Sequence, residues 1–242
     1  MALAGDHVQV LVDGYELTGD VNRLGIADAY DMHDVTAFAD AVHAFIPGVR
    51  RIAVDHFGYL NTAAAKSHPV LKGISIYGVV SVFLGQNASP AVGDPVYSMQ
   101  TRQTAYTTLP EIEKYVPFTA QFAAVGFADG WGIALAAPTS FTNTTTGAAQ
   151  DNGASSSKGA AAFLHVLQAS ASDTYTIIIE GSSTGAFAGE QTTVMTFTLN
   201  GTVLDSERVS NGGTIPRYVR WKATRSGAVG NTVKIAISFV RF

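Results

Sequence analysis

The feature that most constrains the fold of this chain is the shortness and even spacing of its apolar runs. Each run is rich in Val, Ile, Thr and aromatic residues and stops at Gly, Pro, Asn or Asp, the pattern of β-strands joined by turns. This succession predicts an all-β fold built from sandwiches or barrels. No run approaches the roughly 20 apolar residues that cross a membrane. Strands are expected at residues 7–14, 21–26, 50–57, 74–84, 96–108, 115–125, 131–136, 162–168, 174–180, 192–200, 215–224 and 231–242.

One short helix is expected within this all-β frame, over residues 62–72. Its Ala residues favour a helix, Asn61 or Thr62 can cap its start, and Gly73 ends it. Pro69 lies inside the stretch and should break or restart the helix, so two short turns are an equal alternative.

Residues 27–48 show no sustained period and are predicted to form a long loop. Aspartates at positions 28, 31, 34 and 40 are interleaved with single aromatic residues, and Pro47-Gly48 closes the segment. Loops of this length inside compact domains are uncommon and usually functional. We expect residues 28–48 to be poorly ordered in the free chain and ordered against a partner, because their isolated apolar residues form no periodic core face.

A change of composition divides the chain. Residues 141–159 contain Thr, Ser, Gly, Asn and Ala but no large apolar residue after Phe141, which predicts a linker or an exposed loop. The predicted organisation is a β-sandwich domain over residues 1–140, a Ser/Thr/Gly-rich linker over residues 141–159, and a second β domain over residues 160–242.

The two halves show a weak internal echo. Tyr115-Val-Pro-Phe-Thr-Ala120, followed by Val125-Gly126 and an apolar run, matches Tyr218-Val-Arg-Trp-Lys-Ala223, followed by Val229-Gly230 and an apolar run. Unrelated β-strand sequences also resemble one another by chance. A true duplication and an unrelated second domain therefore both stay open.

The chain carries little charge for its size. Of its 242 residues, 47% are hydrophobic and 14% are charged, against about 25% charged in average soluble domains. Either other subunits cover much of the surface, or the chain is a lightly charged monomer rich in Thr, Ser and Gly. Composition alone does not choose between the two.

The distribution of charge argues against a protein that grips nucleic acid. Residues 1–140 carry 7 Lys and Arg against 13 Asp and Glu, residues 141–242 carry 8 against 6, and the formal net charge is −4. Binding to phosphates requires convergent Lys and Arg side chains, and the chain has no basic tract.

The motifs of catalysis and metal binding are absent or incomplete. The chain has no Cys, which excludes disulfides and thiolate sites. Gly181-Ser-Ser-Thr-Gly185 fits the G-x-S-x-G pattern, but a poor helix follows it and no His lies beyond His165, so a hairpin turn is predicted. His33 with Asp31 and Asp34 would bind a cation only if the loop folded on itself. We therefore expect a protein that is not an enzyme, with no catalytic residue, no metal site and no cofactor.

One further candidate site is a sugar-binding patch formed by Tyr218, Arg220 and Trp221. Strand alternation places Tyr218 and Arg220 on one face and Trp221 on the other. This split favours a Trp in the core over a sugar-binding platform. Residues 1–6 lack the basic and apolar regions of a signal peptide, so folding in the cytoplasm is expected.

Four short motifs follow one another in the N-terminal half. They are Val10-Leu-Val-Asp-Gly-Tyr-Glu-Leu-Thr-Gly19, Asp34-Val-Thr-Ala-Phe-Ala-Asp40, Ala44-Phe-Ile-Pro-Gly48 and Arg51-Ile-Ala-Val-Asp-His-Phe-Gly58. Together they resemble the major tail-tube proteins of long-tailed (siphovirus-type) bacteriophages, in which a strand with a Gly turn, an Asp-x-Thr-x-Phe loop, a Pro-Gly corner and a strand ending in Gly recur. Ala39 departs from the Gly that often follows the loop Phe. The resemblance covers residues 8–136, and the order of the motifs carries it.

The resemblance implies a structural virion protein that polymerises into stacked rings and forms the tail tube, the conduit for DNA ejection. It implies a β-sandwich with a flanking helix, in rings of three two-domain subunits or of six. The second domain would be a tube-like duplicate or an immunoglobulin-like decoration. The tape-measure protein and genomic DNA would pass through the lumen without tight binding, and other tail proteins would meet the ends. Assembly would take place in the host cytoplasm, with no membrane partner.

The resemblance also implies that the long loop reaches the next ring of subunits. The candidate inter-ring residues are Asp31, Asp34, Phe38, Phe45, Pro47 and Gly48. Two alternative functions stay open: a single-ring baseplate or terminator component of a phage tail or injection machine, and a carbohydrate-binding β-sandwich module. The first would form one ring only, and the second would be a monomer.

Overall fold

The computed structural model describes residues 7–39, 41–86, 88–112, 114–127, 129–170, 172–227 and 231–242. Three segments used in the sequence analysis lie outside this part: residues 1–6, where no signal peptide was expected, Asp40 of the second motif, and Val229-Gly230 of the internal echo. The described residues confirm the predicted all-β fold with one short helix, α1 (Ser67–Leu71). The strands are β1 (Val8–Val12), β2 (Tyr15–Glu16), β3 (Val21–Asp34), β4 (Phe45–Tyr59), β5 (Tyr77–Leu84), β6 (Pro95–Thr108), β7 (Pro117–Ala124), β8 (Gly130–Phe141), β9 (Thr145–Thr146), β10 (Gln150–Asp151), β11 (Ala160–Gln168), β12 (Thr174–Ser182), β13 (Thr192–Thr196), β14 (Asp205–Asn211), β15 (Tyr218–Ser226) and β16 (Val233–Arg241).

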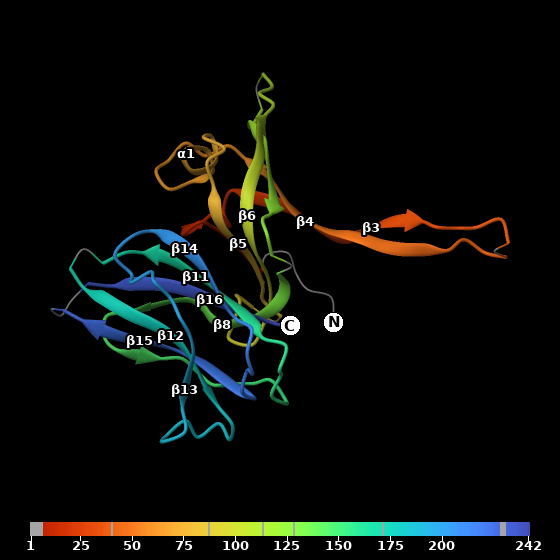
Figure 1. Cartoon of the computed structure of the whole chain (residues 1–242). Helices are drawn as coiled ribbons and strands as arrows, with labels where there is room; N and C mark the ends of the chain where they lie inside the picture. The colour runs from red at the N-terminus through yellow and green to blue at the C-terminus, as the bar shows by residue number, and fades with distance from the viewer. Residues whose placement is uncertain are drawn as a thin grey trace.

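The larger sheet runs through both halves of the chain (Figure 1), in the order β14-β11-β16-β8-β6-β5-β1-β2. At β6 it branches, because residues 95–98 pair with β8 while residues 101–108 pair with β7. Beyond β7 the sheet continues through β4 to β3. Strands β1, β5, β6, β7 and β4 enclose the N-terminal core, which includes Val54, Met99 and Phe122.

The smaller sheet, β10-β15-β12-β13 with β9 paired to β15, covers one face of β8, β11 and β16. Alternate residues of β15, Val219, Trp221 and Ala223, point into the sandwich core, as the period of two in a strand requires. Trp221 is 3% exposed and its ring lies 5.6 Å from that of Phe141. The predicted core Trp is therefore confirmed.

A buried ion pair joins the two halves. Arg208 on β14 donates to Asp129, which directly precedes β8, with Nη2···Oδ1 at 2.8 Å, and the two side chains are 5% and 0% exposed. The guanidinium lies 3.7 Å from the centre of the Phe127 ring. Leu11, Phe83 and Ala236 of β1, β5 and β16 also share one hydrophobic cluster. Residues 8–84 and 205–241 thus pack as neighbours.

The prediction of a long loop over residues 27–48 is wrong. Residues 27–34 belong to β3 and residues 45–48 to β4, and the two strands pair from Val21↔Gly58 to Asp34↔Phe45. The sequence shows no alternation here because both faces of this ribbon are exposed, so no face selects apolar residues. The segment is a hairpin whose two strands are joined by a tip, described for residues 35–39 and 41–44.

The helix is shorter than predicted and is not capped by Asn61 or Thr62. It starts after Lys66, whose side chain makes no capping hydrogen bond. Asp20 holds the preceding turn instead, accepting the Ser67 N–H at 2.8 Å and the Asn61 side-chain N–H at 2.9 Å. Pro69 lies in the first turn of the helix, where its missing N–H costs no helical hydrogen bond.

The predicted linker over residues 141–159 is largely exposed, yet parts of it pair with the smaller sheet. β9 and β10 both lie against β15, and Ser156 forms a bridge with Ile215. Gly147 lies under the indole of Trp221, where an added Cβ would come within 2.0 Å of Nε1. Sequence analysis also missed β14, whose alternation is masked because all seven residues lie partly or wholly exposed.

Two histidines are fully buried. His56 on β4 stacks on Phe122 with ring centres 4.9 Å apart, and neither of its nitrogens has a hydrogen-bond partner. His165 on β11 is hydrogen-bonded through Nε2 to the Ser81 hydroxyl at 2.9 Å. That hydroxyl begins a buried chain through Ser98 to Ser238. Burial lowers the pKa of both imidazoles to about 3.

These pKa shifts predict that the protein loses stability in mild acid. The folded chain keeps both histidines neutral, whereas the unfolded chain protonates them below its ordinary pKa of about 6.5. Their contribution is complete above pH 6.5 and is lost between pH 6.5 and about 3, at up to about 1.4 kcal/mol per pH unit for each histidine. Urea unfolding at pH 7.5 to 4.5 measures this slope.

His56→Leu serves as the matched variant, because it removes one titrating group without removing a hydrogen bond. Its unfolding free energy should fall less steeply with pH than that of the unsubstituted chain, by about 1.4 kcal/mol per unit. Equal slopes for the two proteins would contradict the assignment.

Candidate functional site

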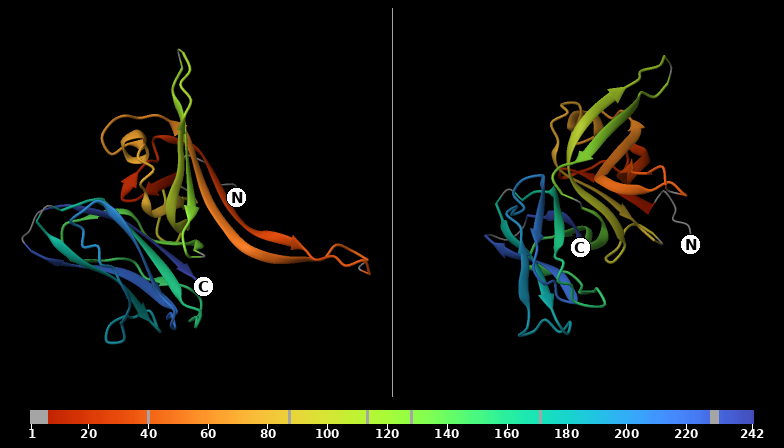
Figure 2. Two further views of the ribbon diagram at one scale, coloured as in Figure 1. Left: turned by 45° about the horizontal axis from the view of Figure 1, so that its top comes forward. Right: turned by 45° about the vertical axis from the view of Figure 1, so that its right-hand side comes forward.

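The most conspicuous surface feature is the ribbon formed by the outer parts of β3 and β4. Residues 53–59 of β4 pair with β7, but residues 45–52 pair only with β3. From this point on, both outer edges of the two strands are unpaired in the described chain, and the strands leave the body, as Figures 1 and 2 show. We call residues 27–52 the ribbon and its end, described for residues 35–39 and 41–44, the tip.

The ribbon exposes a concentration of large apolar side chains. Each keeps at least 48% of its surface accessible, and Phe38 at the tip is fully exposed. Large exposed apolar side chains gathered on one projection usually mark an interface. The residues are Tyr30, Met32, Val35, Phe38, Val42, Phe45, Ile46 and Val49.

At the base of the ribbon an ion pair ties its two strands together, and a tyrosine of the body contacts that pair. Arg50 donates two parallel hydrogen bonds to Asp28, at 2.7 and 2.6 Å, and the Tyr97 hydroxyl lies 3.5 Å from the same carboxylate. The hydrogen bonds from Arg50 lower the pKa of Asp28, so the pair stays charged at neutral pH. Tyr97 belongs to β6 and makes an edge-to-face contact with Trp131 on β8. The ribbon therefore projects in a defined direction.

The tip is organised by a cluster of polar contacts. Asp34 accepts hydrogen bonds from the backbone N–H of Thr36, at 2.9 Å, and from the Thr36 hydroxyl. The same hydroxyl accepts the Ala44 N–H at 3.0 Å, and His43 Nδ1 lies 3.5 Å from Asp34. The hydrogen bonds from Thr36 lower the pKa of Asp34. The tip consequently presents Phe38 on a preorganised turn.

The structure places the six predicted inter-ring residues on this one ribbon. Asp31 and Asp34 lie on β3, Phe38 lies at the tip, and Phe45, Pro47 and Gly48 lie on β4. Pro47 is opposite Met32 at a register shift, where an edge strand tolerates its missing N–H. Gly48 lies beneath His33, whose Nε2 would be 2.4 Å from an added Cβ. All six predicted residues therefore lie on the ribbon or its tip.

His33, Asp31 and Asp34 do not converge on a cation site. Within the part of the chain that the structure describes, no group of three or more His, Asp or Glu side chains is placed to hold a metal ion. Likewise, no helix among the described residues is long and apolar enough to cross a membrane.

A second exposed hairpin joins β6 to β7, where the sequence predicted strands at residues 96–108 and 115–125, but its apolar character was not predicted. The connection, described for residues 109–112 and 114–116, carries the exposed side chains of Leu109, Ile112 and Tyr115. Tyr115 stacks on Tyr59 with ring centres 5.7 Å apart. Leu109-Pro110 and Ile112, which stand beside the charged residues Glu111 and Lys114, were the sequence signal for exposed apolar side chains in this turn.

The Gly181–Gly185 segment is a turn, as predicted. Gly181 and Ser182 end β12, the next residues bend toward β13, and no helix starts there in the described chain. The carboxylate of Glu190 accepts hydrogen bonds from the hydroxyls of Ser182, Ser183 and Thr184. These contacts lower the pKa of Glu190 and tie the turn together, so the serines have a structural role.

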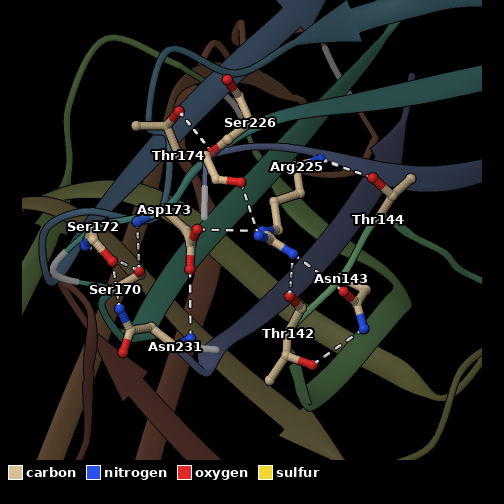
Figure 3. A network of polar contacts seen from close by, with 11 residues as sticks. Thr142, Asn143, Thr144, Ser170, Ser172, Asp173, Thr174, Arg225, Ser226 and Asn231 are labelled. Atoms are coloured by element: carbon tan, nitrogen blue, oxygen red, sulfur yellow. Dashed lines mark hydrogen bonds and ion pairs between the residues drawn. The ribbon is translucent and has the colours of Figure 1, made fainter. Parts of the chain in front are cut away.

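A buried Arg–Asp network at the end of the smaller sheet is also structural (Figure 3). Arg225 donates through Nε to Asp173 at 3.2 Å and through Nη2 to the carbonyl of Gly227 at 2.8 Å. Its backbone N–H donates to the Thr144 hydroxyl, and Asp173 also accepts the Asn231 N–H. The network fastens the start of the 141–159 segment to the ends of β12 and β15.

No protein-family model matches the chain, and no curated protein matches its sequence. Solved structures with similar features include a protein of the virion of a native gene transfer agent particle (14% identity, 53% of this chain, 98% of that chain, TM-score 0.43). Another is the tube-terminating cap of the anti-feeding prophage (9% identity, 55% of this chain, 91% of that chain, TM-score 0.41). A third is the SPP1 Dit protein, described as a paradigm of hub adsorption apparatus in phages infecting Gram-positive hosts (10% identity, 97% of this chain, 99% of that chain, TM-score 0.35). Because all three TM-scores lie below 0.5, the functional argument rests on the geometry of this chain.

Proposed function

We propose that this chain is a structural subunit of a phage tail that assembles with copies of itself into stacked rings, forming the tail tube. The observation that carries the proposal is the ribbon. It is ordered by its own pairing, with the Asp28–Arg50 ion pair across its base, yet its apolar side chains have no cover in the described chain. Exposed apolar surface of this kind usually marks an interaction site.

A second copy of the chain is the partner proposed. The ribbon offers two unpaired strand edges, and free edges pair with other chains unless charge, Pro or a cover blocks them. Pro47 and the aspartates discourage indiscriminate pairing, while the apolar side chains remain available for a defined contact. The low charged fraction, 14%, is consistent with a surface largely covered by other subunits.

In the proposed tube, DNA would pass through the lumen without binding tightly to the protein. The formal net charge is −4, and several basic side chains are already engaged in ion pairs, including Arg208, Arg217 and Arg225. Ring number, three or six, and the division into domains 1–140 and 160–242 with a linker between them belong to this proposal. So do the tape-measure protein and the end-binding tail proteins as partners.

The proposal predicts that removing the ribbon abolishes assembly without unfolding the body. Tyr30 and Arg50 are opposite one another, so a two-residue Asn-Gly turn replacing residues 31–49 closes the hairpin while retaining the Asp28–Arg50 pair. Negative-stain electron microscopy and light scattering should show tubes for the full chain and monomers for the shortened chain, with equal β-type circular dichroism.

Val203→Ser is the matched control, because Val203 is a half-exposed apolar residue far from the ribbon in sequence and should not affect tube formation. Tubes of normal appearance from the shortened chain would contradict the inter-ring role. Single rings from the full chain would favour the baseplate or terminator alternative, and a stable monomer would favour the carbohydrate-binding module.

The proposal also predicts weak binding to duplex DNA. With a net negative charge and no convergent basic patch, affinity should not exceed the non-specific range of roughly 10⁻⁴–10⁻⁶ M at physiological salt. Filter binding over a series of salt concentrations measures this directly. Nanomolar retention that falls steeply with salt would point to a component that grips DNA.

A further inference from the structure

The rolled N-terminal sheet has a seam between its first strand and its last. β1 pairs with β2 and β5, β3 pairs with β4, and no strand pairing joins β1 to β3 in the described chain. The seam opens into a groove of about 380 Å³ lined by Val8 and Val10 of β1, by Thr18, and by residues 21–24 of β3. We call it the seam groove.

The seam groove is apolar with one charge at its rim. Val8, Val10, Val21 and Leu24 supply aliphatic walls, and Arg23 is the only charged side chain among the described residues of the lining. The neighbouring hollow beside Phe57 and Tyr59 also includes Arg23, and its described lining holds no carboxylate. A concave site of aliphatic walls with one placed polar group is typical of a binding site.

Arg23 is held ready for an anionic partner. Its guanidinium lies 4.0 Å from the centre of the Phe57 ring, a cation–π contact that orients the planar group and leaves its N–H donors at the edge. No ion pair joins Arg23 to a carboxylate within the residues that the structure describes. A carboxylate is a preferred partner of a guanidinium, because it can accept two parallel N–H hydrogen bonds from it.

The ribbon tip has the complementary chemistry. Phe38 is fully exposed, and residues 31–49 of the sequence, beyond the Asp28–Arg50 pair, include three aspartates and no Lys or Arg. Asp31 and Asp34 lie on the same projection as Phe38. An aromatic residue flanked by carboxylates matches an aliphatic groove with an arginine at its rim.

The tip cannot occupy the groove of its own chain. The ribbon leaves the body and runs away from it in Figure 1 and in the left view of Figure 2. Residues 45–53 of β4, at about 3.3 Å per residue, carry the tip roughly 26 Å outward from the last contact with β7. This reach suits a neighbouring molecule.

We propose that the seam groove of one copy receives the ribbon tip of a second copy, with Phe38 in the aliphatic part and the carboxylates of Asp31 and Asp34, on the adjoining part of β3, facing Arg23. This inference rests on the proposed function, because it names the receiving surface for the ribbon. It makes the contact heterologous: the tip and the groove are different surfaces, so the pairing repeats from copy to copy instead of closing a two-fold dimer.

Disulfide mapping tests this contact directly, because the chain has no cysteine of its own. Ala39→Cys places a thiol at the exposed tip while keeping Phe38, and Asn22→Cys places one at the exposed groove rim. The two full-length single-cysteine proteins, one with a size tag, are mixed under assembly conditions and oxidised. We expect a disulfide between the tagged and untagged chains.

Thr176→Cys, an exposed position on the smaller sheet, is the matched control and should not cross-link to Ala39→Cys. Adding Phe38→Ser to the tip variant should lower the cross-link yield by roughly tenfold or more, as loss of an aromatic anchor does. Arg23→Gln should also lower it.

The possible failures are distinguishable. Assemblies may form in which Ala39→Cys does not cross-link to Asn22→Cys, or cross-links equally to Thr176→Cys. Either result would overturn the seam groove as the receiving surface and would leave the proposed function intact. A chain that forms neither assemblies nor cross-links would overturn both.

Discussion

Much of this structure depends on one constraint: a two-stranded ribbon cannot bury its own surface. In the body of the chain, strand pairing satisfies the backbone hydrogen bonds of a continuous sheet, and a second sheet packed on it buries apolar side chains. The ribbon does not, because outside residues 53–59 each of its strands has only the other as a neighbour. Its exposed aromatic and aliphatic residues gain their stabilisation only from another molecule.

The features around the ribbon act together to make that contact specific. Asp28, Arg50 and Tyr97 set its direction, and Asp34 with Thr36 sets the shape of its tip. Preorganisation of this kind lowers the ordering entropy that binding would otherwise cost. The buried Arg208–Asp129 pair and the hydroxyl chain from His165 to Ser238 join the two halves of the body from which the ribbon projects.

Sequence reasoning reached the fold class because strand alternation is a local signal. It placed β1, β5, β6, β12 and β16 closely, and it placed Trp221 in the core from its neighbours in the strand. It failed at the ribbon for a physical reason: with no buried face, pairing of β3 with β4 leaves no periodic trace. It also missed the helix start, since Asp20 anchors that turn from far away in the sequence.

Candidate site residues were found more readily than their arrangement. The cluster of aspartates and aromatics between residues 28 and 48 identified the segment, but the seam groove was invisible in sequence. Val8 and Val10 lie on one strand and residues 21–24 on another that does not pair with it, so only the folded sheet brings them together.

Hydrogen exchange of the ribbon amides tests the central claim most directly, since it compares the free and assembled states of the same full-length chain. Amides of residues 24–34 and 45–52 should exchange quickly in dilute, unassembled protein, because both ribbon edges are open to water. In assembled material we predict at least a roughly tenfold slower exchange across this segment, while the amides of β11 and β16 stay equally protected in both states. Assemblies in which the ribbon amides exchange as fast as in the free chain would contradict the account.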